Sequence, residues 1–203
     1  MFEKTLGGEI ICKKIDSHED IDDELVGHPD SIYNEVDQQF RVEWLINELK
    51  INNAERPIME VGTACGYILN KIDGEIGIDI RPDRLLVAKK KYPNRKFYYA
   101  NILNLQPFYD MGIKTIVIAE TLEHLQYDSV HHAIIHCLRT APFIYYTVPN
   151  SETDPNVSRN LEHKWYPTHD NLKVALDYTS KHINIVYDIR CSNNFLYGII
   201  KRI

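Results

Sequence analysis

Short apolar runs alternate with helix-like segments along most of this chain, and this alternation constrains the fold more than any other feature. The runs lie at residues 56–62, 75–80, 96–100, 114–120 and 143–149. Each has the length of a buried strand. Strands that alternate with helices predict a mostly parallel sheet with helices on both faces.

The segments between these runs are predicted to be helices. The first begins at Val36, and Phe40 and Trp44 continue its apolar i, i+4 spacing. Pro82 suits the first turn of the next helix, to about residue 91, because its missing N–H has no partner to lose there. Asp128 is placed to cap a third helix, to about residue 139. A fourth is expected near 168–177.

The chain closes with two apolar runs, 183–189 and 194–202, separated by only four residues. Four residues are too few for a parallel crossover, so these strands should pair as an antiparallel hairpin. The predicted fold class is α/β. Its architecture is a three-layer Rossmann-like sandwich with a seven-stranded, mostly parallel sheet and an antiparallel C-terminal hairpin strand.

Length and composition indicate one domain with a short extension. The 203 residues can bury one sizeable core. Residues 1–35 contain the acidic stretch "DSHEDIDDELVGHPD" and are expected to form an N-terminal extension or lid. Residues 36–203 are expected to form the main domain.

Net charge and cysteine usage limit the cellular compartment and the partners that this chain is expected to have. A net charge of −6 argues against a protein that coats nucleic acid or an anionic membrane. No run approaches the roughly 18 apolar residues of a membrane helix, and the first residues lack the layout of a signal peptide. The four cysteines are scattered without a C-x-x-C pair, which fits reduced thiols. A cytoplasmic location without a membrane partner is therefore expected.

The loop after the first strand, "IMEVGTACGYI" (58–68), carries an acid and two glycines: Glu60, Gly62 and Gly66. Its spacing is neither the G-x-G-x-x-G of dinucleotide sites nor the phosphate loop of nucleotide triphosphatases. Asp79 ends the next strand about 20 residues later, where an acid that binds ribose hydroxyls is expected. The pattern favours an adenosine ligand without a phosphate chain.

Five segments together resemble the class I, seven-stranded S-adenosylmethionine-dependent methyltransferases. They are "IMEVGTACGY", "IGIDIRPDRLLVAKKK", "FYYANILNL", "IVIAETLEHL" and "YYTVPN". The resemblance covers about residues 36–203, including the closing hairpin, and residues 1–35 fall outside it.

The resemblance implies a cofactor site for S-adenosylmethionine and its product S-adenosylhomocysteine. Glu60 would sit near the methionine amino group, Asp79 would bind the ribose hydroxyls, and Ile80 would pack on the adenine. Asn101 stands where the family more often has Asp, and an amide can still pair with the adenine edge. The implied cofactor-binding residues are Glu60, Gly62, Thr63, Gly66, Asp79, Ile80, Asn101, Ile102 and Glu120.

The segment "AETLEHL" supplies polar groups for acid–base or metal chemistry. In the first turn of a helix, Glu120, Glu123 and His124 would lie on one side, at i, i+3 and i+4. His163 follows the fifth strand and should open on the same rim. Glu123, His124 and His163 are the candidate catalytic residues.

Glu120, Glu123, His124 and His163 are also a candidate divalent-metal set. This set resembles that of the metal-dependent 2′-O-methyltransferases that cap the 3′ end of small RNAs, and also that of quinone-biosynthesis O-methyltransferases. The same E-x-L-E-H-L pattern is common in relatives without a metal, where the Glu and His cap the helix. Both readings stay open at this point.

Three functions are compatible with these motifs. The favoured one is methyl transfer to a small-molecule or sugar- or peptide-like acceptor, at oxygen or nitrogen. The second is metal-assisted 2′-O-methylation of an RNA 3′ end, the one nucleic-acid partner considered. The third is a non-catalytic binding module with the same fold. His28, Tyr33, Trp165 and Tyr166 either line an acceptor pocket or pin a lid onto the core.

Overall fold

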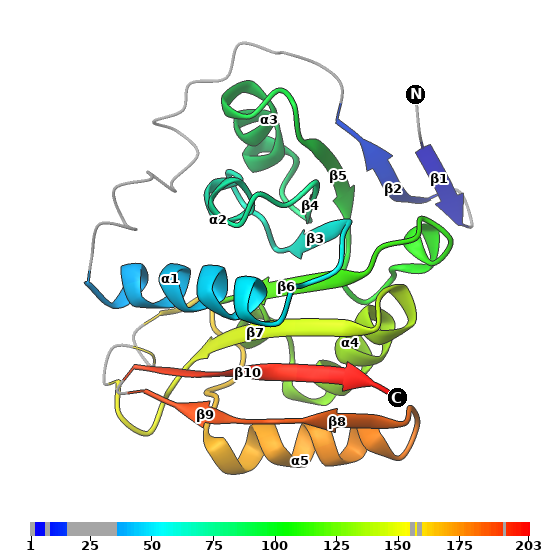
Figure 1. Cartoon of the computed structure of the whole chain (residues 1–203). Helices are drawn as coiled ribbons and strands as arrows, with labels where there is room; N and C mark the ends of the chain where they lie inside the picture. The colour runs from blue at the N-terminus through cyan, green and yellow to red at the C-terminus, as the bar shows by residue number, and fades with distance from the viewer. Residues whose placement is uncertain (1–2, 7–8, 16–35, 155–156, 158–159, 193) are drawn as a thin grey trace.

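The computed structural model describes residues 3–6, 9–15, 36–154, 157, 160–192 and 194–203. A single mixed sheet runs through the molecule in the order β1-β2-β5-β4-β3-β6-β7-β10-β8, with β9 also paired to β10 (Figure 1). The predicted α/β class and the layered architecture are confirmed. No helix in these ranges is long and apolar enough to cross a membrane.

The five predicted parallel strands are all present. They are β3 (Ile58–Val61), β4 (Ile76–Asp79), β5 (Lys96–Ala100), β6 (Thr115–Ala119) and β7 (Phe143–Pro149). Their neighbours pair in parallel throughout. Strand order reverses between β3 and β6, because β4 follows β3 on one side and β6 lies on the other. In sheets of this type, such a switch point opens the ligand crevice at the carboxyl ends of the strands.

The predicted antiparallel closing hairpin is confirmed. β10 (Phe195–Arg202) pairs antiparallel with β7 on one side, and with β8 (Ile185–Tyr187) and β9 (Arg190–Cys191) on the other. The strands β5, β4, β3, β6, β7, β10 and β8 therefore form the seven-stranded sheet that the sequence predicts.

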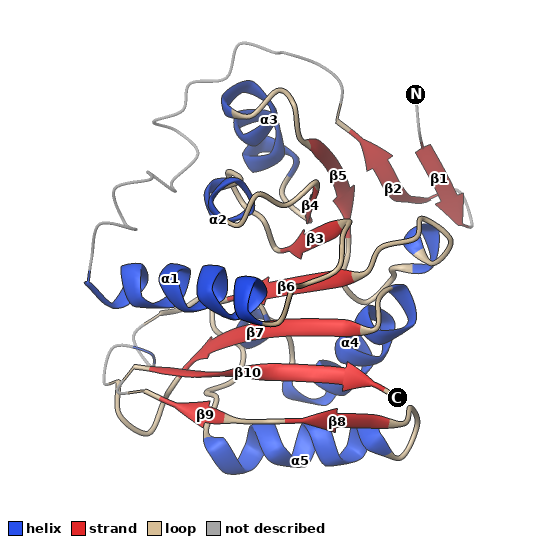
Figure 2. Ribbon diagram, viewed as in Figure 1, coloured by secondary structure: helices blue, strands red, loops and turns tan. Residues whose placement is uncertain are grey.

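Helices cover both faces of the sheet (Figure 2). They are α1 (Val36–Ile51), α2 (Tyr67–Lys71), α3 (Pro82–Lys91), α4 (Tyr127–Thr140) and α5 (His169–Ser180). On one face α1 and α2 pack with Ile58 and Val117, while α4 and α5 pack with Met59 and Ile116 on the other. Alternate residues of a central strand thus enter different cores, so these strands are apolar throughout.

Two strands that the sequence analysis did not predict extend the sheet at the β5 edge. β1 (Glu3–Leu6) and β2 (Glu9–Lys14) form an antiparallel hairpin, and β2 pairs antiparallel with β5. Cys12 lies opposite Ala100 and is fully buried. Residues 3–6 and 9–14 therefore belong to the sheet. The acidic stretch at 16–30, and with it the lid prediction for that part, lies outside the described residues.

Two local predictions on the helices were wrong. Asp128 does not cap α4: Gln126 precedes the helix in an extended conformation, and Asp128 lies in the first turn, where its charge suits the helix dipole. In α1 the helix is correct, and Leu45 and Leu49 further along it are buried. At its start, however, Phe40 is 42% exposed and packs edge-on against Tyr197, and Arg41 and Val42 are buried instead.

Candidate active site

A cleft of about 670 Å³ opens at the carboxyl ends of the parallel strands, at the switch point between β3 and β6. Its volume lies within the usual range for small-molecule sites. The predicted site residues that line it are Glu60, Gly62, Asp79, Ile80, Asn101, Ile102, Glu120, Glu123, His124 and His163. The fold therefore gathers most of the predicted site from five separate loops.

The two glycines of the loop after β3 have different structural roles. Gly62 lines the cleft with φ +74°, and a Cβ there would lie 2.2 Å from Thr121 Oγ1, so only glycine fits. Gly66 also has a positive φ, +80°, but its missing side chain faces Tyr92 and Ala88 rather than the cleft. Gly66 therefore lets α2 begin close to α3, and only Gly62 brings backbone to the ligand side.

Glu60 is a buried carboxyl group at the floor of the cleft. It is 1% exposed and accepts hydrogen bonds from the Thr63 hydroxyl and from the Leu69 N–H, the latter at 2.9 Å. Burial raises the pKa of Glu60 to about 8, against the opposing effect of these hydrogen bonds. Thr63, which is buried, thus holds the Glu60 carboxyl group in place through this hydrogen bond. A cation beside Glu60 would favour its ionised form.

Asp79 is the last residue of β4, and its carboxylate links the loop that follows β3 to the loop that follows β4. One carboxylate oxygen accepts from the Ala64 N–H and the other from the Arg81 N–H, both at 2.8 Å. A carboxylate has about four lone-pair sites, so two of them can still accept hydroxyls. Next to it, Ile80 offers an apolar side chain that is 58% exposed. Asn101 uses its side-chain oxygen to accept from the Leu103 N–H at 2.9 Å.

The turn after β6 is not the α-helical turn that the sequence suggested. Glu120 has a left-handed φ of +49°, and a short 3₁₀ helix, η4, then spans Leu122–His124. Glu120 therefore points differently from Glu123 and His124. Its carboxylate lies 3.5 Å from the Arg41 guanidinium of α1.

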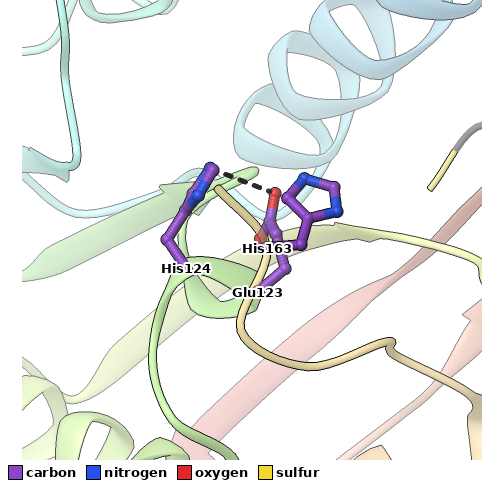
Figure 3. A group of neighbouring side chains, drawn as sticks. All are labelled: Glu123, His124 and His163. Carbon is purple, nitrogen blue, oxygen red and sulfur yellow. Dashed lines mark ion pairs between the residues drawn. The ribbon is translucent and has the colours of Figure 1, made fainter. Parts of the chain in front are cut away.

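Glu123, His124 and His163 come together at one place in the cleft (Figure 3). One donor atom from each lies within 4.8 Å of the others, and His124 Nε2 is 4.0 Å from Glu123 Oε1. The two imidazole rings stand edge to face with centroids 5.2 Å apart. Three of the four residues predicted as metal ligands thus form a cluster, and Glu120 lies apart from it against Arg41.

The hydrogen bonds of the two histidines fix which nitrogen carries the proton. Nδ1 of His124 lies 3.2 Å from the Glu162 carbonyl oxygen, and Nδ1 of His163 lies 3.1 Å from that of Val157. A carbonyl only accepts, so both Nδ1 atoms donate, and Nε2 is the ring nitrogen of each histidine that can bind a metal. Nε2 of His163 lies 3.0 Å from Asn160 Nδ2. Burial, and next the neighbouring His124, lower the pKa of His163 and favour its neutral form.

The donor set suits a divalent transition-metal ion. Glu123 is 1% exposed, its Oε2 atom is buried without a hydrogen-bond partner among the described residues, and burial raises its pKa to about 8. The other oxygen of this carboxyl group, Oε1, faces His124, so a cation held there would neutralise the ionised form of a buried acid. Two imidazole nitrogens favour manganese, cobalt or zinc over calcium. Donor atoms around one tetrahedral ion with bonds of about 2.1 Å are about 3.4 Å apart. The three donor atoms now lie within 4.8 Å of one another, so binding requires the side chains to draw together.

Sequence reasoning missed Arg41. This residue is 4% exposed and lines the cleft, and its charge offsets a small part of the rise that burial causes in the pKa values of Glu60 and Glu123. The apolar periodicity of α1 predicted that Phe40 and Trp44 lie on the buried face, and Arg41 is not part of that pattern. The signal that could have found it is the unpaired surplus of acids, since Glu60, Glu120 and Glu123 together require a buried cation.

Of the aromatic residues considered for an acceptor pocket, Trp165 is buried and does not line the cleft, whereas Tyr166 is 47% exposed. His28 and Tyr33 lie outside the described residues.

Solved structures with the same fold are methyltransferases. Over 81% of this chain, the small RNA methyltransferase HEN1 superposes with a TM-score of 0.68 at 19% identity, and the chain spans 25% of that protein's length. The methyltransferase domain of bacterial-CtHen1-CN gives 0.68 at 14% identity, covering 82% of this chain and 100% of that one. NodS, an N-methyltransferase from Bradyrhizobium japonicum WM9 in complex with S-adenosyl-L-homocysteine, gives 0.66 at 15%, covering 87% and 94%.

These likenesses define the fold of the chain as that of the class I S-adenosylmethionine-dependent methyltransferases. The sequence itself matches no protein-family model and no curated protein. At identities below one fifth, these likenesses establish the shared architecture alone, and the chemistry of this chain depends on the residues of its own cleft.

Proposed function

We propose that this chain is an S-adenosylmethionine-dependent methyltransferase. The observation that carries the proposal is the pair of carboxyl groups at the ends of β3 and β4, Glu60 and Asp79, on either side of the Gly62 loop. The proteins of like fold that were solved with S-adenosylhomocysteine support the same cofactor.

Each residue has a distinct part in holding the cofactor. Glu60 pairs with the methionine ammonium group, which ionises the buried carboxyl. Asp79 accepts the ribose hydroxyls while its backbone bonds hold the loop in shape. Gly62 lets the backbone approach the ligand, and Ile80 covers one face of the adenine. Methyl transfer is an in-line displacement at an activated methyl group, so positioning and exclusion of water supply most of the catalysis.

Calorimetric titration with S-adenosylhomocysteine tests the cofactor proposal. The wild-type chain should bind it with a dissociation constant near the micromolar range. No heat and no rise in melting temperature at millimolar ligand would exclude the methyltransferase function. It would also exclude a binding module that uses the same cleft for this ligand.

A second, finer proposal concerns the acceptor. The Glu123–His124–His163 cluster favours a hydroxyl acceptor whose deprotonation is assisted by a divalent ion held by these three residues. Such an ion, when bound, would lower the pKa of the acceptor hydroxyl as it does that of bound water. The buried Glu123 carboxyl group, whose Oε1 faces His124, and the paired Nδ1 donors of the two histidines support this reading.

The 2′-hydroxyl at an RNA 3′ end is the acceptor to test first. Its support is the similarity of the cluster to the E-x-x-E-H plus His pattern, together with the fold shared with a small RNA methyltransferase. A small hydroxyl-bearing molecule is the alternative, and the net charge of −6 favours it over a long RNA. The cytoplasmic location stays a prediction.

Transfer of a labelled methyl group to matched oligonucleotides separates these acceptors. A short RNA with a free 3′-terminal diol should be labelled and become resistant to periodate, whereas one with a 2′-deoxy end, which periodate does not cleave, should not be labelled. Chelation should abolish the labelling, and added Co²⁺ or Mn²⁺ should restore it. Label in neither RNA, with S-adenosylhomocysteine still bound, would leave the cofactor proposal standing and move the acceptor to the small-molecule class.

A further inference from the structure

Three hydrogen bonds from Lys164 and Trp165 join the loop between β7 and α5 to η4, in addition to the exposed one between His124 and the Glu162 carbonyl. The Trp165 indole Nε1 donates to the Leu122 carbonyl at 2.7 Å. The backbone N–H groups of Lys164 and Trp165 donate to the Glu123 carbonyl at 2.8 and 3.4 Å. Both acceptor carbonyls lie on the 3₁₀ helix that carries Glu123 and His124, and all three donors lie within two residues of His163.

Trp165 is the buried member of this junction. Its side chain is 5% exposed and belongs to the main core together with Leu122. The Tyr127 ring lies 5.3 Å from it between centroids, and the Tyr127 hydroxyl donates to the Asn171 carbonyl at 2.9 Å. Core packing on one side and an indole hydrogen bond on the other therefore fix the position of Trp165.

The other bonds of His163 cannot fix its place relative to His124. Its ring contacts Val157 and Asn160, which belong to the same loop and move with it. The remaining side-chain link between the segments runs from His124 to the Glu162 carbonyl, and it lies at an exposed position where water competes. A hydrogen bond in the low-dielectric interior is stronger than an exposed one, so the indole bond, together with the two backbone bonds to the Glu123 carbonyl, holds His163 beside His124.

We propose that Trp165 is a positioning residue that holds His163 beside Glu123 and His124, and thereby sets the affinity of this cluster for a divalent ion. The inference deepens the metal-assisted function proposed above and rests on it. Trp165 touches neither the cleft nor the donor atoms, so it acts through the loop. Groups that orient metal ligands from outside typically change affinity by about 10- to 100-fold when removed.

Titration with Co²⁺, followed by its visible absorption, tests this inference without an activity assay. W165F keeps a ring in the core and removes the indole donor, and it should weaken Co²⁺ binding at least about tenfold. Y127F is the matched control, because it removes a hydrogen bond from the other ring of the same pair without touching Leu122 or Glu123. Y127F should bind Co²⁺ within about twofold of the wild type, by the same reasoning.

Affinity for S-adenosylhomocysteine, measured on the same samples, reports whether each variant is folded. It should stay unchanged in both. Equal Co²⁺ affinity in W165F and the wild type would overturn the role of Trp165 and leave the metal site standing. No Co²⁺ band in the wild type would overturn the metal site and this inference with it, and the cofactor proposal would then depend on S-adenosylhomocysteine binding alone.

A second measurement covers the case in which W165F does not fold. The chain has two tryptophans, and Trp44 lies on α1 against Tyr197. In W44F, emission comes from Trp165 alone. Co²⁺ should change this emission saturably, at the concentration that builds the absorption band, and H163A should remove the change. An absorption band without a change in emission would contradict the coupling of Trp165 to the cluster.

Discussion

The Arg41 guanidinium lies 3.5 Å from the Glu120 carboxylate, where the cofactor side of the cleft meets the Glu123–His124–His163 cluster. Burial raises the pKa values of Glu60 and Glu123, and the charge of Arg41 offsets a small part of that rise. One buried cation from α1 therefore stands among three carboxyl groups from two different loops. The helix that precedes the first parallel strand is thus part of the site.

Loss of Arg41 should destabilise the chain. R41M leaves Glu120 and its neighbours without their cation. We expect the free energy of unfolding, measured in urea, to fall by about 2–3 kcal/mol. This is less than the full cost of breaking a deeply buried pair, because Glu120 is 20% exposed. In R41M/E120Q part of this loss should be recovered, with a coupling energy of about 1–2 kcal/mol. The control R95M breaks the exposed Arg95–Asp73 pair and should cost less than about 1 kcal/mol. Equal losses in R41M and R95M would contradict this role for Arg41.

Alanine at Gly62 should weaken cofactor binding. The new Cβ would collide with Thr121, and its φ of +74° would be strained as well. G112A separates these two effects, because Gly112 has φ +69° but no heavy atom within 4 Å of the added Cβ. Calorimetry should show at least about tenfold weaker S-adenosylhomocysteine binding in G62A, a loss of about 1.4 kcal/mol, and none in G112A. Similar affinities in both variants would mean that the loop backbone does not approach the ligand.

Asparagine at Asp79 should also weaken cofactor binding. The amide removes the charge that ribose hydroxyls would meet and turns an N–H donor toward the Ala64 N–H. Hydrogen bonds to a charged group contribute about 1.5–3 kcal/mol each, so a loss of tenfold or more in affinity is expected. D83N is the comparison, since Asp83 pairs with Arg81 at the surface. The prediction fails if D79N binds S-adenosylhomocysteine as tightly as D83N does.

The ligand-free chain should respond to pH through Glu60. Burial raises its pKa from 4.5 to about 8, so between these values the folded chain holds a proton that the unfolded chain releases. Below pH 4.5 Glu60 is protonated in both states and does not affect stability. As the pH rises from 4.5 to about 8, the free energy of unfolding falls.

E60Q removes this effect and should raise the melting temperature at pH 8 more than at pH 5. Each kcal/mol corresponds to about 2–4 °C in a domain of this size. Glu123 titrates in both proteins and does not affect the difference between them. Thermal unfolding of the two proteins at both pH values is the measurement, and an equal shift at pH 5 and pH 8 would argue against a buried, protonated Glu60.

The parallel strands and the closing hairpin could be predicted because their signals are local. A strand buried on both faces is apolar throughout, and a four-residue gap permits one pairing only. The β1–β2 hairpin was missed because its pairing partner is β5, whose edge exists only after the chain has folded. Its strands are half charged, so their sequence does not stand out as a buried run.

The sequence by itself determined which chemical groups lie near the carboxyl end of each strand: Glu60 within the first apolar run, Asp79 at the end of the second, and Glu123 with His124 after the fourth. Only the tertiary structure decided how these groups face one another. It turned α1 so that Arg41 enters the cleft, sent Glu120 toward it through a left-handed φ, and joined His163 to Glu123 and His124. The physical reason is range: residue order and periodicity act over a few neighbours, whereas burial, charge pairing and the Trp165 bond join segments 40 or more residues apart.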